Sequence, residues 1–154
     1  MKKDSRLSGV LHVLLHMAEQ NGPATSAMLA RAMDTNPVVV RRVMSGLREQ
    51  GYVRSEKGHG GGWTLAPGWQ QITLRQIYDA LGEPSLLAIG NRTEMPGCLV
   101  EKAVNAALEG AFRDAEALLL KRLGEVRLGA LSADFHGRMK ARAGRYDMET
   151  AHGS

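Results

Sequence analysis

The first third of the chain carries two apolar stripes at helical spacing, separated by a short turn. Residues 5–20 place apolar side chains three and four positions apart, which predicts an amphipathic helix with Ser5 as its N-cap. Asn21-Gly22-Pro23 predicts the end of this helix, and Thr25 or Ser26 is expected to cap a second, short helix. The predicted inner faces are Leu7, Val10, Leu11, Leu14 and Ala18 in the first helix and Met28, Leu29, Ala32 and Met33 in the second.

A third helix and a β-hairpin are predicted next. Asn36-Pro37 favours a helix start, because Asn is a strong N-cap and Pro suits the first helical position, and Gly51 predicts the end. The expected inner face of this helix is Val40, Val43, Met44 and Leu47. Residues 52–56 and 62–65 alternate as strands do, on either side of a glycine-rich tip at 57–61. Three helices followed by a hairpin is the order of a winged helix-turn-helix domain.

The second half of the chain predicts more helices. Thr73 is expected to cap a helix over residues 74–81, and residues 82–97 are rich in turn residues. A further helix is expected over 98–108. Beyond it, apolar side chains at spacings of three and four are typical of a helix that packs along a partner helix. This dimer seam is Phe112, Ala115, Leu119, Leu123, Val126 and Ala130, and it is too short to separate self-association from packing within the chain.

The predicted fold is mainly α with a small β-hairpin wing, a winged helix-turn-helix followed by a long C-terminal dimerisation helix. The expected division is a winged domain over 1–82, a linker or effector loop over 83–97, dimerisation helices over 98–136 and a flexible tail over 137–154. The tail has few large apolar residues, so we expect it to fray.

Composition and charge narrow the function classes. The 154 residues are 44% apolar and 23% charged, contain no apolar run of membrane-spanning length and show no signal-peptide cleavage site, so we expect a cytoplasmic protein. The single cysteine excludes an intrachain disulfide and an all-cysteine metal site in one chain. Residues 31–75 hold seven basic side chains against three acidic ones. Such a local excess points to phosphate groups, although a solvated charged face is the alternative.

A helix-turn-helix reads DNA with the first turns of its second helix. That helix begins here at Asn36, and its outward positions are Val38, Val39, Arg41 and Arg42. Arginine suits bidentate contact with guanine, and valine can meet a thymine methyl group. We expect Arg41 or Arg42 to contact a base, with phosphate contact or plain solvation as the alternative.

Two further segments are candidate DNA contacts. The helix start at Thr25 and Ser26 offers backbone N–H groups to a phosphate. The hairpin tip offers Lys57, His59 and the bare backbone of Gly60 to a minor groove, unless it is a turn without a functional role.

The sequence gives no support for an enzyme or a metal site. The string His59-Gly60-Gly61-Gly62 resembles the oxyanion segment of lipases, but no G-x-S-x-G nucleophile motif exists, and no Gly-Lys-Ser/Thr completes a P-loop. His12 and His16 lie four residues apart without an identifiable third ligand, so they are expected on an exposed face. Cys98 stands at a predicted helix start, where thiols oxidise more readily; it is either a sensor or a small buried residue.

The hairpin and its surroundings resemble a known family. Residues 51–66 (GYVRSEKGHGGGWTLA), Thr25–Ala30, and Ile72-Thr73-Leu74 with Ile77 are similar to the Rrf-two family of bacterial transcription regulators, of the IscR, NsrR and CymR type. The resemblance spans about residues 5–132. It implies a homodimer with paired C-terminal helices on a palindromic operator.

The resemblance also suggests residue roles. The base-reading positions of the family fall on Val38, Arg41 and Arg42, and its wing contact falls on Lys57. Cluster-binding members carry three cysteines before the dimer helix, whereas this chain has only Cys98, so we expect no iron–sulfur cofactor. Three forms of control stay open: a thiol switch at Cys98, a small-molecule or oxidant effector, or a regulator that binds no ligand. The expected function is a homodimeric repressor on double-stranded DNA, and the alternative is a winged-helix protein-interaction module.

Overall fold

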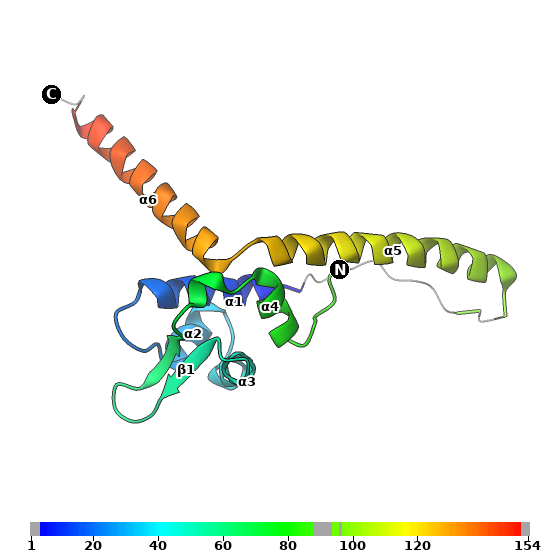
Figure 1. Cartoon of the computed structure of the whole chain (residues 1–154), viewed down its shortest axis with the longest axis horizontal. Coiled ribbons are helices and arrows are strands. Elements are labelled where there is room, and N and C mark those ends of the chain that lie inside the picture. The colour runs from blue at the N-terminus through cyan, green and yellow to red at the C-terminus, as the bar shows by residue number, and fades with distance from the viewer. Residues whose placement is uncertain (1–3, 88–93, 96, 152–154) are drawn as a thin grey trace.

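The computed structural model describes residues 4–87, 94–95 and 97–151, with side chains as far as residue 143. Residues 88–93 and 96 of the expected effector loop and 152–154 of the expected tail lie outside the described residues. The elements are α1 (Arg6–Glu19), α2 (Ser26–Ala32), α3 (Pro37–Glu49), β1 (Val53–Glu56), β2 (Gly62–Leu65), a 3-10 turn η1 (Trp69–Gln71), α4 (Leu74–Ala80), α5 (Leu99–Glu125) and α6 (Leu128–Ala151). Figure 1 shows α1 to α4 and the hairpin as one body, with α5 and α6 leaving it in two different directions.

The helix starts follow the predicted capping residues with one exception. The Asn36 side chain accepts hydrogen bonds from the backbone N–H groups of Val38 and Val39, at 3.0 and 3.1 Å. Thr73 and Gln76 form a reciprocal capping box at the start of α4. Ser5 makes no side-chain capping bond. Ser5 does occupy the predicted N-cap position of α1, but the neighbouring Asp4 carboxylate accepts the Arg6 N–H, at 3.0 Å, in place of its side chain.

The core joins α1, α3, the hairpin and α4. Its fully buried large side chains are Leu14, Met44, Leu47, Ile77, Leu128, Val10, Val13, Val40 and Val53. The predicted face of α2 needs correction: Leu29 and Ala30 are buried, whereas Met28 and Ala32 are exposed. The buried side of this short helix is shifted by about one residue from the predicted one. The side that faces α1 and α3 is buried, and Met28 does not lie on it despite its large apolar side chain.

Two glycines of the wing, Gly61 and Gly62, lie too close to neighbouring backbone to carry a side chain. The hairpin pairs Ser55 with Trp63, and the backbone of Trp63 also exchanges two hydrogen bonds with Ala24, at 2.8 and 2.9 Å. Gly62 has a φ of +151°, and a Cβ there would meet the Ala24 carbonyl. A Cβ on Gly61 would meet the Glu56 carbonyl. A larger residue at Gly62 would therefore push the wing away from the chain that precedes α2, and one at Gly61 would distort the hairpin turn itself.

The C-terminal half differs from the prediction in two ways. The expected helix over 98–108 and the seam helix are one continuous helix, α5, which ends at Glu125. Val126 is extended, with its carbonyl accepting the Leu74 N–H at 2.9 Å, so it is not part of a helical seam and Ala130 lies on α6. The Leu128 N–H then donates to Ile72 at 2.8 Å. These backbone contacts break the helix even though the apolar spacing continues through the break.

The beginning of α6 belongs to the winged body. Leu128 is fully buried in the core formed by α1 and α3, although the sequence assigns it to the dimerisation segment. The helix continues to Ala151, past Gly137, where the sequence predicts the start of a flexible tail. A helix can form in a segment with few large apolar side chains, because Ala and Arg also have high helix propensity. In the part of the chain that is described, no helix combines the length and hydropathy needed to cross a membrane.

Candidate nucleic-acid interface

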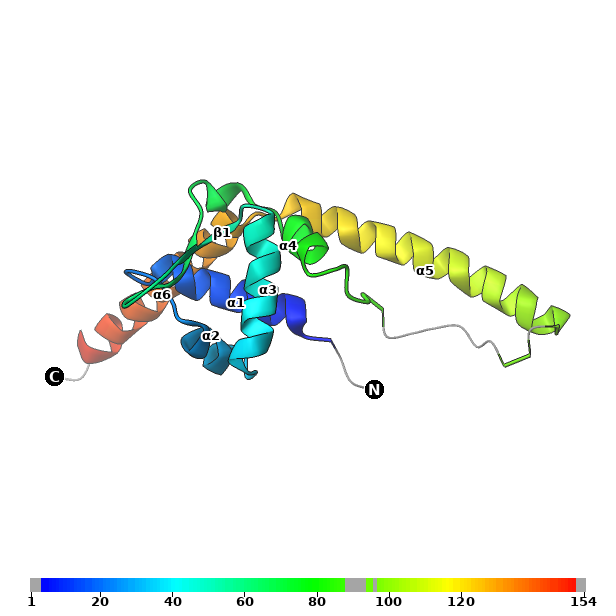
Figure 2. The ribbon, with the colours of Figure 1, turned by 90° about the horizontal axis from the view of Figure 1, so that it is seen from below.

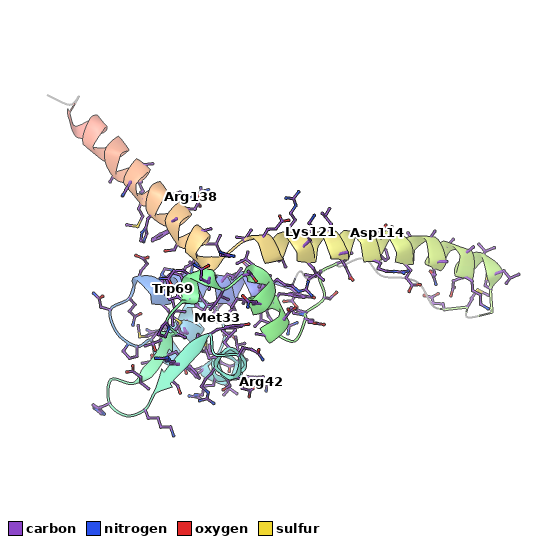
Figure 3. All side chains as sticks on the ribbon, in the orientation of Figure 1. Met33, Arg42, Trp69, Asp114, Lys121 and Arg138 are labelled. Carbon is purple, nitrogen blue, oxygen red and sulfur yellow. The ribbon has the colours of Figure 1, made fainter. Side chains whose placement is uncertain are left out.

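Helix α3 presents its first two turns to solvent. Its inner positions Val40, Met44 and Leu47 are buried, whereas Arg41 and Arg42 are exposed and Val38 is 60% exposed. Figure 2 views this face from below, with α3 lying across it and the wing beside it. In Figure 3, Arg42 points away from the body on the side opposite α5 and α6. The outward positions predicted from the sequence therefore lie together on one accessible face.

The two hydroxyl groups at the start of α2 accept hydrogen bonds from other residues of the protein. The Thr25 hydroxyl oxygen accepts the Met28 N–H at 3.2 Å. The Ser26 hydroxyl accepts a hydrogen bond from the Trp63 indole Nε1 at 3.0 Å. Ser26 therefore links α2 to the wing, while the predicted phosphate contact at this helix start concerns backbone N–H groups and not these hydroxyls.

The wing tip projects into solvent beside α3. Lys57, His59 and Gly60 are all exposed, between the ends of β1 and β2. Figure 1 shows the tip and α3 on the same side of the body, away from α5 and α6. This arrangement allows α3 to enter a major groove while the tip reaches an adjacent part of the duplex.

Sequence reasoning missed Arg48 and the residues that hold it. The Arg48 guanidinium lies 5.9 Å from the centroid of the Trp63 ring, and its Nη1 donates to the Ser55 hydroxyl at 3.3 Å. Arg41, Ser45 and Arg48 follow at spacings of four and three, so they share one edge of α3, and this edge faces the wing. The helical spacing alone does not reveal these contacts, because Ser55 and Trp63 reach Arg48 only when the hairpin folds back along α3 and pairs the two residues.

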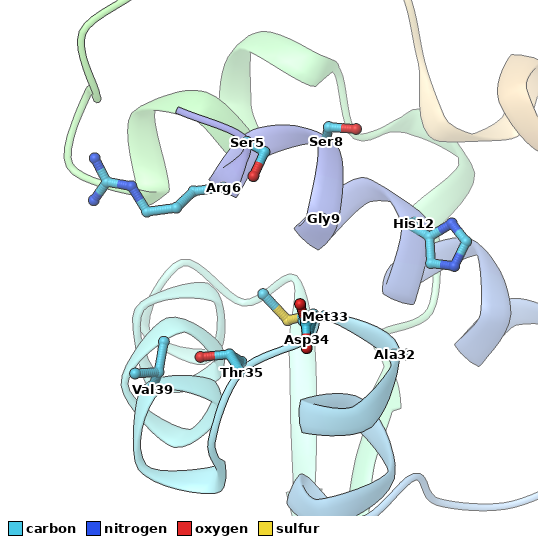
Figure 4. A pocket seen from close by; sticks show the side chains of 10 residues that line it. All are labelled: Ser5, Arg6, Ser8, Gly9, His12, Ala32, Met33, Asp34, Thr35 and Val39. Carbon is cyan, nitrogen blue, oxygen red and sulfur yellow. The ribbon is translucent and has the colours of Figure 1, made fainter. Parts of the chain in front are cut away.

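A pocket and a pair of histidines lie outside the exposed face of α3. A pocket of about 460 Å³ lies between the start of α1 and the turn after α2, and its walls combine Arg6, His12 and Asp34 with Val39 of α3 (Figure 4). His12 and His16 contact each other at 3.1 Å between their Nε2 atoms. Within the described ranges, no three His, Cys, Asp or Glu side chains come together as a metal site.

Cys98 occupies the N-cap position of α5 and is half-buried. Its side chain makes no capping hydrogen bond, while its carbonyl accepts the Lys102 N–H at 3.0 Å. Just after α4, the Pro84 carbonyl accepts a hydrogen bond from the Tyr78 hydroxyl at 2.8 Å. Burial raises the pKa of Tyr78 above its ordinary value, with smaller contributions from nearby carboxylates.

Comparison with known proteins agrees with this geometry. The chain is similar to YwnA of Bacillus subtilis (strain 168), named as an HTH-type transcriptional regulator, with 29% identity over 113 residues that cover 73% of this chain and 84% of YwnA. A solved transcriptional regulator from Lactobacillus plantarum shares the fold, with a TM-score of 0.69 and 21% identity over 94% of this chain and 98% of its own. IscR of T. potens gives a TM-score of 0.61 at 16% identity, over 87% and 88% of the two chains.

The family comparison covers most of the chain. Residues 4–134 match the Rrf2 family, described as iron-dependent transcriptional regulators. The match includes the helix-turn-helix, the wing and α5. It confirms the resemblance and the fold expected from the sequence, and it places the chain among regulators rather than enzymes. The chain belongs to the Rrf2 family of transcriptional regulators.

Proposed function

We propose that the chain is a homodimeric repressor that binds a palindromic operator and occludes a bacterial promoter in the cytoplasm. The observation that carries this proposal is the exposed first half of α3, where Arg41 and Arg42 are both exposed to solvent, beside a protruding wing. Val38, Val39, Arg41 and Arg42 would read bases, and Lys57, His59 and Gly60 would approach the minor groove. Thr25 and Ser26 would contribute through the backbone N–H groups at the start of α2.

The partner in the dimer would be a second copy of α5. This helix leaves the winged body and exposes large apolar side chains, with Leu99 79%, Val100 72% and Leu118 57% exposed. Exposed apolar area on that scale favours association. The predicted seam residues on this helix are Phe112, Ala115, Leu119 and Leu123, of which all but Ala115 are half-buried within the monomer. Val126 would contribute at most from the α5–α6 junction.

Control of DNA binding would act where α5 begins. Oxidation of Cys98, or a small molecule bound near this helix start, would change how α5 is held and hence the spacing of the two α3 helices. The pocket in Figure 4 is a second place for a small molecule, because it joins α1 to Val39 at the start of α3.

The iron in the family description does not fit the residues present. An iron–sulfur cluster takes several thiolate ligands, and Cys98 is the single cysteine of the chain. No alternative group of three metal-binding side chains exists among the residues with described positions. We therefore propose a regulator that works without a cluster.

Footprinting combined with sedimentation tests this function. A palindromic dimer should protect two half-sites in the DNA upstream of its own gene, with centres about one helical turn apart. The protein–DNA complex should contain two chains. A variant carrying Arg41→Gln and Arg42→Gln should keep the dimer and lose the footprint. Protection by a single chain, or no protection even at low salt, would instead support the protein-interaction alternative.

A further inference from the structure

A groove of about 550 Å³ lies at the base of the wing, between the end of α3 and strand β1. It is lined by Arg48, Gly51, Val53, Arg54, Ser55, Ala66 and Pro67. Two of these side chains are positively charged and none is negatively charged. Both Arg48 and Arg54 are exposed to solvent. The groove is therefore a local concentration of positive charge that is separate from the first turns of α3 and from the wing tip.

Arg48 is held in place by the wing. Its guanidinium lies 5.9 Å from the Trp63 ring centroid and donates to the Ser55 hydroxyl at 3.3 Å. One Nη1 contact uses only a part of the donors that a guanidinium carries, so several N–H groups remain for a ligand. Because the side chain is already ordered, binding an anion costs it less conformational entropy than an unrestrained surface arginine would lose.

The charges of this groove are not neutralised within the protein. Among the described residues, neither Arg48 nor Arg54 forms an ion pair with a carboxylate. Other exposed arginines of the chain do so: Arg75 pairs with Asp79 and Arg138 with Asp134, at 2.9 and 2.7 Å. Two arginines without a described carboxylate partner beside one groove fit an anion from outside the chain, and the planar fork of arginine matches the oxygens of a phosphate.

We propose that this groove binds a phosphate of the duplex backbone and thereby fixes the register of α3 in the major groove. The inference rests on the proposed DNA-binding function and extends it to a contact that carries no base information. Figure 2 shows the end of α3 beside β1 on the same face as the exposed part of α3. Arg41, Ser45 and Arg48 share the wing-facing edge of α3, so this edge leads from the base-reading end toward the groove.

The test compares Arg48→Gln and Arg54→Gln with Arg138→Gln, a matched loss of charge on α6 at a side chain that is 80% exposed. Figure 3 shows Arg138 on the opposite side of the body from Arg42. The readout is fluorescence anisotropy on operator DNA and on a scrambled duplex over a range of salt. Arg48→Gln and Arg54→Gln should each weaken binding to both duplexes by a similar factor and reduce the salt slope by about 0.9. Arg138→Gln should change neither quantity.

Two further arms make the outcome specific. Arg48→Lys keeps the charge and should keep the salt slope while losing affinity, because the bidentate fork is gone. Inorganic phosphate should weaken binding no more than chloride at equal ionic strength, and selective competition would assign the groove to a small anion instead. Thermal unfolding checks that each variant remains folded.

Three results are distinguishable. If Arg48→Gln and Arg54→Gln behave like Arg138→Gln on a wild-type protein that binds DNA, the groove is not a phosphate site. If either substitution weakens binding to the operator alone, the contact reads bases and the proposal is wrong. If the wild-type protein binds neither duplex at low salt, the proposed function itself fails.

Discussion

The indole Nε1 of Trp63 donates a hydrogen bond to the Ser26 hydroxyl at 3.0 Å, across 37 positions of sequence. This contact joins strand β2 of the wing to the first residue of α2. Together with the paired backbones of Ala24 and Trp63, it fixes the wing relative to the helix-turn-helix. The two parts that are expected to contact DNA are therefore held as one rigid unit.

Trp63→Phe tests this connection. A smaller aromatic ring remains, whereas the hydrogen bond to Ser26, some buried ring volume and part of the support for Arg48 are lost. We expect the free energy of unfolding to fall by about 1 kcal/mol and DNA affinity to fall severalfold. Denaturant unfolding and anisotropy measure the two effects. Trp69→Phe on η1 is the control, and equal effects of the two substitutions on DNA affinity would argue against a specific role for Trp63.

Substitutions of Arg41 or Arg42 should alter sequence discrimination, whereas substitutions of Arg48 or Arg54 should weaken binding to every duplex alike. Alanine at whichever of them contacts a base should reduce discrimination at one base pair of each half-site, by about 1–3 kcal/mol. Binding measured across a set of single-base operator variants identifies the position. A uniform loss over all operator variants, for both substitutions, would show that these side chains contact only phosphates.

Leu128 is predicted to stabilise the winged body even though it lies on α6. Its side chain is fully buried, so Leu128→Ala should lower the free energy of unfolding by about 2–5 kcal/mol. Met139→Ala, on the same helix but 55% exposed, is the matched control and should change stability little. Equal stability of the two variants in urea would mean that α6 does not pack into the core.

Tyr78 should make stability sensitive to alkaline pH. Burial raises the pKa of its hydroxyl in the folded state, so the unfolded chain loses this proton first. The contribution of Tyr78 is then fully present below the ordinary tyrosine pKa and is lost as pH rises through the folded-state pKa. Tyr78→Phe should flatten the decline in stability in that range, in addition to removing the bond to Pro84. An unchanged pH profile in alkaline urea titrations would contradict this assignment.

Cys98→Ser separates the two proposed forms of control. If the thiol is the sensor, an oxidant such as hydrogen peroxide should change operator affinity in the wild-type protein and leave the serine variant unaffected. Anisotropy before and after oxidation, with reversal by a reductant, provides the measurement. A full oxidant response in Cys98→Ser would exclude the thiol and direct attention to a small-molecule effector.

The local features of the fold could be predicted from the sequence, whereas its long-range features could not. Asn36-Pro37 marks the start of α3 because capping depends on neighbouring backbone groups. The break at Val126 is different, since it is set by backbone pairing with Ile72 and Leu74, and the apolar spacing does not register it. Gly62 looks like a simple turn residue in the sequence, but its close approach to Ala24 depends on the tertiary fold.

The residues of the candidate site also fall into those that the sequence predicts and those that depend on the tertiary fold. The outward positions of α3 follow from helical periodicity once the buried face is known, so Arg41 and Arg42 could be identified. Arg48 could not, because its role depends on Trp63 and Ser55, which reach it only when the hairpin folds back along α3.

The most direct test of the central claim is anisotropy of the wild-type protein on DNA from its own upstream region, at two salt concentrations, against a scrambled duplex of equal length. DNA binding by the face of α3 and the wing predicts tight binding that prefers the upstream sequence and weakens steeply with salt. The Arg41→Gln, Arg42→Gln double variant should lose the preference. Binding that is absent at low salt, or that survives this double substitution with its sequence preference intact, would contradict the claim.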